Sequence, residues 1–96
     1  MSAHLNQYLI LLLIRGIQRE SNPNALEQIT NEIAMRTHLK CNNIVQKEDT
    51  NEIMVEVMAW GLTKETVAKQ VAEEIFEITC AVLEQPEGVS VHIQNT

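Results

Sequence analysis

The chain has 96 residues, of which 45% are hydrophobic and 21% are charged, a balance typical of one globular domain rather than of a disordered segment. Its formal net charge is −6, and its seven basic residues are scattered along the sequence. Nucleic acid and anionic membrane surfaces are bound by clustered positive charge, so we expect neither as a partner.

The cysteines and the first apolar run bear on the cellular compartment. Cys41 and Cys80 are the chain's two cysteines, too few for a disulfide framework, so we expect reduced thiols in a cytoplasmic protein. The apolar run from Tyr8 to Ile14 has no Lys or Arg before it and no small-residue cleavage site after it, unlike a signal peptide. It is also too short to span a bilayer as a helix. We therefore expect a buried element of the fold.

The first half of the chain, residues 5–50, is predicted to form a β-α-β unit. Its apolar run over 8–17 fits either a strand buried on both faces or a helix, because a continuous run has no diagnostic periodicity. Gly16 lies at the exit of this run, as Gly61 lies at the exit of the corresponding strand of the second half, which favours a strand; a long N-terminal helix stays the alternative. A turn at 21–24 then opens a helix that runs to about residue 39, and a second strand opens at 44.

The second half, residues 51–96, has the clearer pattern. Apolar residues alternate over 53–60, which predicts a strand that ends at Gly61. Thr63 stands where a helix N-cap is expected, and spacings of three and four predict an amphipathic helix from Lys64 to about Glu84. Pro86 and Gly88 end this helix, and alternation over 89–94 predicts the last strand.

The order β-α-β-β-α-β predicts an α+β fold in one domain over residues 1–96. A short polar turn between the second and third strands suits an antiparallel hairpin, as in the ferredoxin-like arrangement. Two helices would then cover one face of a four-stranded sheet, and nothing in the chain would cover the other.

That uncovered face is the predicted interface. It combines apolar and polar side chains in the manner of a protein–protein contact, and the first strand, apolar on both faces, also calls for a partner on this side. We expect a homo-oligomer, a dimer or a trimer, or else a different protein partner. The predicted interface residues are Met54, Glu56, Met58, Trp60, Ser90 and His92.

The strand over 53–61, the helix from Lys64 and the closing run over 88–93 resemble the β-α-β unit of the tautomerase (macrophage migration inhibitory factor-like) superfamily. The run over 14–17, followed by a helix, looks like the first unit of small members of that family. The resemblance implies oligomerisation through the open sheet faces and a pocket between subunits. The family's catalytic residue is an N-terminal proline, but Ser2 follows Met1 here, so no catalytic residue is carried over.

Two groups of residues are candidates for a catalytic or metal-binding role. Glu56 and His92 would form an acid–base pair if the third and fourth strands lie close together; the competing interpretation is a polar contact within or across an interface. His38 and Cys41 have the spacing of one half of a zinc site, but no second pair accompanies them, so we expect no metal. No motif indicates a cofactor.

These observations favour a non-enzymatic oligomeric or partner-binding module that uses its open sheet face. The alternative is a small tautomerase-like enzyme or ligand binder with a pocket at a subunit interface.

Overall fold

The computed structural model describes residues 8–16, 22–47, 49, 51–59, 64–84 and 87–95. Within these ranges, four strands and two helices follow one another in the order β-α-β-β-α-β, as predicted. Residues 8–15 form a strand, which excludes the helix that the apolar run left open there. The elements are β1 (Tyr8–Arg15), α1 (Pro23–Thr37), β2 (Cys41–Lys47), β3 (Glu52–Ala59), α2 (Glu65–Leu83) and β4 (Val89–Asn95).

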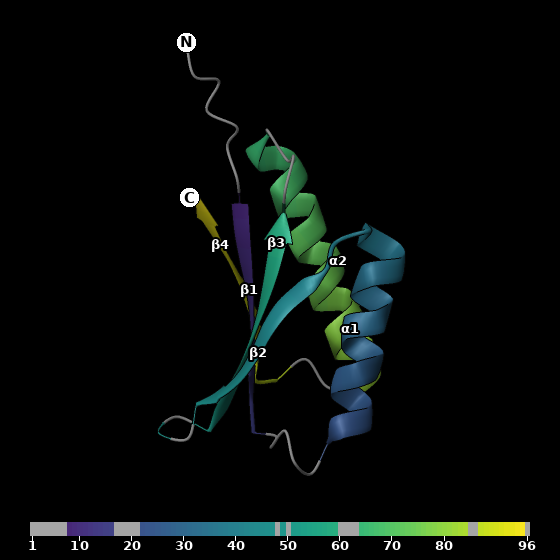
Figure 1. Ribbon diagram of the computed structural model, residues 1–96, viewed down its shortest axis with the longest axis vertical. Helices are drawn as coiled ribbons and strands as arrows, with labels where there is room; N and C mark the ends of the chain where they lie inside the picture. Colours follow the sequence, from purple (N-terminus) through teal and green to yellow (C-terminus); the bar gives the residue numbers. More distant parts are fainter. Residues whose placement is uncertain are drawn as a thin grey trace.

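The four strands form one sheet in the order β2-β3-β1-β4, and every neighbouring pair is antiparallel (Figure 1). This is the ferredoxin-like topology, so the predicted α+β fold is confirmed. The two central strands are β1 and β3, and β2 and β4 form the edges. The first strand of the chain thus lies between the third and the fourth.

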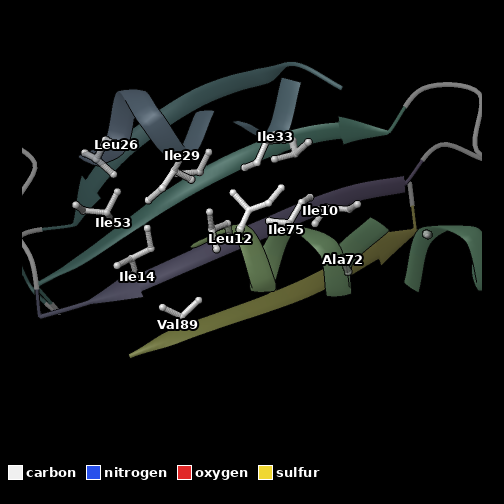
Figure 2. Close-up of a cluster of buried hydrophobic side chains, with 14 of the residues drawn as sticks. Ile10, Leu12, Ile14, Leu26, Ile29, Ile33, Ile53, Ala72, Ile75 and Val89 are labelled. Atoms are coloured by element: carbon white, nitrogen blue, oxygen red, sulfur yellow. The ribbon is translucent and has the colours of Figure 1, made fainter. Parts of the chain in front are cut away.

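Both helices lie on the same side of the sheet (Figure 1). Helix α2 packs against β1 and β4, and α1 packs against α2 and β2. The core fills the layer between helices and sheet with aliphatic side chains, and its buried members come from both helices and three strands (Figure 2). In β1 the buried residues are Tyr8, Ile10, Leu12 and Ile14, because alternate side chains of a strand point to the same face, and the last three are fully inaccessible.

Three predicted boundaries move in the structure. Helix α1 ends at Thr37, because His38 adopts a left-handed conformation (φ 61°) and donates its backbone N–H to the carbonyl of Ala34 at 3.0 Å. Strand β2 begins at Cys41 rather than at 44, with a register shift between Cys41 and Asn43 that suits an edge strand. The N-cap of α2 is Lys64, and Thr63, the predicted cap, lies outside the described residues, as does Gly61.

The turn before β4 depends on Gly88. This glycine has φ 79°, and its carbonyl accepts the N–H of Arg15 at 2.8 Å. A Cβ at this position would lie 2.7 Å from the Arg15 carbonyl oxygen, which is backbone and has little freedom to move. We expect Gly88→Ala to lower the free energy of unfolding by about 2–3 kcal/mol, as measured by urea denaturation.

Gly16→Ala is the matched control for that prediction. Gly16 also has positive φ, at 86°, but among the described atoms nothing lies within 4 Å of a Cβ built there. The control should therefore show only the conformational cost, about 1 kcal/mol. Equal losses for the two variants would contradict a role for the close approach between Gly88 and Arg15.

Candidate functional site

The candidate site is the sheet face that points away from both helices, called the open face from here on. No described helix or strand covers it (Figure 1). The strand registers place its members in cross-strand rows, since directly paired residues share a face. Its residues are Leu9, Leu11 and Leu13 of β1, Met54, Glu56 and Met58 of β3, Ser90, His92 and Gln94 of β4, and Asn43 and Val45 of β2.

The centre of the open face is apolar. Leu9, Leu11 and Leu13 run along the central strand β1, and all three side chains are only partly buried. On β3, Met58 is paired with Leu9 and Met54 with Leu13. Val45, which is 41% exposed, extends the row of Met54 onto the edge strand β2. Apolar side chains thus continue across three strands, which is typical of a surface that binds another protein.

A polar row crosses the middle of this apolar surface. Leu11 is paired with Glu56 on one side and with His92 on the other. Two strand spacings separate the backbones of Glu56 and His92, about 10 Å. The condition for an acid–base pair, adjacent third and fourth strands, is therefore not met within one chain, because β1 lies between them. Glu56 instead accepts a hydrogen bond from Asn43 Nδ2 at 3.4 Å.

An ion pair that the sequence did not predict lies at one end of the open face. Arg15 Nε lies 3.0 Å from Glu52 Oε2, and the two residues are paired across β1 and β3. The Glu52 side chain is 9% exposed, whereas that of Arg15 is 71% exposed. Arg15 is the last residue of β1 and Glu52 the first of β3, and the sequence gives no signal for their pairing, because it does not reveal the register between the strands.

The predicted interface residues mostly fall on the open face. Met54, Glu56, Met58 and Ser90 are partly exposed, and His92 is exposed. Trp60 lies outside the described residues. The three leucines of β1 were not named in advance, although the two-sided apolarity of the run 8–17 was the signal for them.

A surface hollow lies at the β4 edge of the sheet. Its volume is about 430 Å³, and Glu65 Oε1 and Lys69 Nζ in its lining are 3.8 Å apart. His92 is among its lining residues and Glu56 is not, so the hollow does not unite the predicted acid–base pair. The residues that line it are Tyr8, Glu65, Lys69, Val91, His92 and Ile93.

The cysteines are free thiols of low reactivity in the folded chain. Burial raises the pKa of the Cys41 thiol to about 11, so its nucleophilic thiolate is scarce at neutral pH. Cys41 is the first residue of β2, whereas His38 is the C-cap of α1. Within the described ranges, no group of three or more His, Cys, Asp or Glu is placed to bind a metal ion. Nor does the described part contain a helix long and apolar enough to cross a membrane.

Comparison with known proteins identifies the fold and no activity. No family model and no curated protein matches the chain. Among solved structures, the C-terminal domain of the MgtC protein from Mycobacterium tuberculosis is similar over 100% of this chain and 93% of that one, with a TM-score of 0.52 and 12% identity. At that identity the likeness concerns the fold alone.

A second solved structure is that of the YXEP protein of Bacillus subtilis, a dinuclear metal binding peptidase from the M20 family. It matches 94% of this chain and 25% of its own length, at 9% identity and a TM-score of 0.46. A TM-score below 0.5 does not establish a common fold.

Proposed function

We propose that this chain is a small non-enzymatic assembly module that pairs with a second copy of itself through the open face. The observation that carries the proposal is the column of Leu9, Leu11 and Leu13, which lies on a central strand and remains partly exposed. Covering this second apolar face of β1 removes it from water and so stabilises the assembled state. A face of this kind is self-complementary in the way that a two-fold interface requires.

The size of the open face supports a reversible dimer. With about 4.8 Å between strands and about 3.3 Å per residue, four strands of seven residues cover roughly 450 Å². Complete overlap of two copies would bury on the order of 1,000 Å² together, an upper bound that lies at the low end for specific protein–protein contacts. We therefore expect an association that depends on concentration in the micromolar range. The free thiols of Cys41 and Cys80 suit a reducing compartment such as the cytoplasm.

Multi-angle light scattering over a dilution series tests the proposal. The molar mass should approach twice that of the chain, 10.9 kDa, as the concentration rises, and Met54→Lys should weaken the association about tenfold or more. The matched control is Met35→Lys, because Met35 is 73% exposed on α1 and away from the open face. A chain that stays monomeric at several hundred micromolar, or equal effects of the two variants, would refute the proposal.

A further inference from the structure

Glu56 and His92 flank the same leucine from opposite sides of the open face. One chain keeps them apart, yet both lie in the row that a second copy would cover. We infer that, in the dimer on which this inference rests, the two-fold axis runs along β1 and Glu56 of each copy meets His92 of the other. The interface thereby acquires two identical polar contacts, one on each side of its leucine column.

The geometry follows from the strand order. A two-fold axis between the sheets and parallel to β1 places β1 over β1 and exchanges the β3 side with the β4 side. Because the axis lies along the strands, residues of one row stay level, so Glu56 faces His92 of the second copy twice. Packed sheets lie about 10 Å apart, a gap that a glutamate and a histidine side chain bridge together.

Two other arrangements give the Glu56 carboxylate no partner across the interface. An axis across the strands at the level of Leu11 sets Glu56 over Glu56 and His92 over His92. An axis between β1 and β3 sets Glu56 over Leu11. Both improve the overlap of methionines with apolar residues. In both, however, the Glu56 carboxylate loses water and keeps only its hydrogen bond from Asn43, and burying a charge that lacks an opposite charge costs more than such contacts return.

The other charges near the axis fit the inferred arrangement. Arg15 would approach Arg15 of the second copy at the end of the leucine column, but each guanidinium is already paired with Glu52 at 3.0 Å. A histidine can satisfy the carboxylate as a cation or through a neutral ring N–H, so the contact does not require one protonation state.

Charge exchange between the two positions tests the inference, with the dimer dissociation constant measured by sedimentation equilibrium. Glu56→Lys sets Lys against His, and His92→Glu sets Glu against Glu, so each single variant should dimerise about tenfold more weakly or worse. The double variant restores opposite charges at both contacts and should return to within about threefold of the wild-type constant. Glu73→Lys and Gln70→Glu, on the exposed surface of α2, control for the change in net charge.

The outcomes separate this inference from the proposed function. A wild-type chain that never dimerises refutes both. A wild-type dimer whose double variant stays as weak as the single variants refutes the inferred axis and leaves the module in place. If a charge reversal prevents folding, as seen by circular dichroism, Glu56→Gln and His92→Gln replace it in a double-mutant cycle, and a coupling close to zero overturns the inference.

Discussion

Replacing Leu12 with alanine is expected to lower the free energy of unfolding by about 3–4 kcal/mol. Leu12 is fully buried in the middle of β1, and its side chain points into the layer between the sheet and the helices (Figure 2). Neighbouring core groups such as Ile10 and Ile75 are also fully buried, so the surroundings have little room to collapse into the cavity. For a domain of this size, whose total stability is of order 5–15 kcal/mol, the variant sits close to unfolding.

The adjacent residue supplies the control. Leu11→Ala removes the same atoms from the same strand, but its side chain is on the open face and already partly exposed. In urea denaturation at a concentration too low for association, we expect it to cost only about 1 kcal/mol. Similar losses at positions 11 and 12 would contradict the assignment of the two faces of β1.

The presence of leucines on both faces of β1 explains why the first half of the fold was harder to predict than the second. In β3 the buried Ile53, Val55 and Val57 alternate with a glutamate and two methionines, so the period of two is visible in the sequence. In β1 leucines occupy the face that should be polar, and the period disappears. Only the folded structure shows which residues of β1 are buried, because burial depends on which face of the sheet the helices cover.

The sequence predicted which face of the sheet the site residues share, but not the distances between them, because these depend on the strand order. Alternation along β3 and β4 correctly assigned Met54, Glu56 and His92 to one face. Their distances depend on which strand lies between, and strand order is a property of the whole chain rather than of a local pattern. The acid–base interpretation of Glu56 and His92 required the third and fourth strands to lie close together, and β1 separates these strands within one chain. The Arg15–Glu52 pair was not foreseen. The tautomerase resemblance and the oligomeric state stay predictions.

The second large effect is expected from Leu11→Lys, at the centre of the open face. Association of the variant should weaken by more than about a hundredfold, because central residues dominate interface energetics and an ammonium group in a dry contact loses its hydration. The fold should survive, since the new side chain would lie beside Glu56 on the exposed surface of the monomer. Sedimentation velocity would measure the association, and thermal unfolding followed by circular dichroism would measure stability.

Val45→Lys separates a central contact from a general effect of added charge. Val45 is 41% exposed and lies on the edge strand β2, at the rim of the open face. In a dimer whose axis follows β1, β2 extends beyond the overlap of the two sheets, so this variant should weaken association less than tenfold. Equal losses of dimer affinity for the variants at positions 11 and 45 would indicate that the centre of the contact lies closer to β2. Unchanged association of the folded Leu11→Lys variant would exclude the open face and leave the edge strands as the route to a dimer.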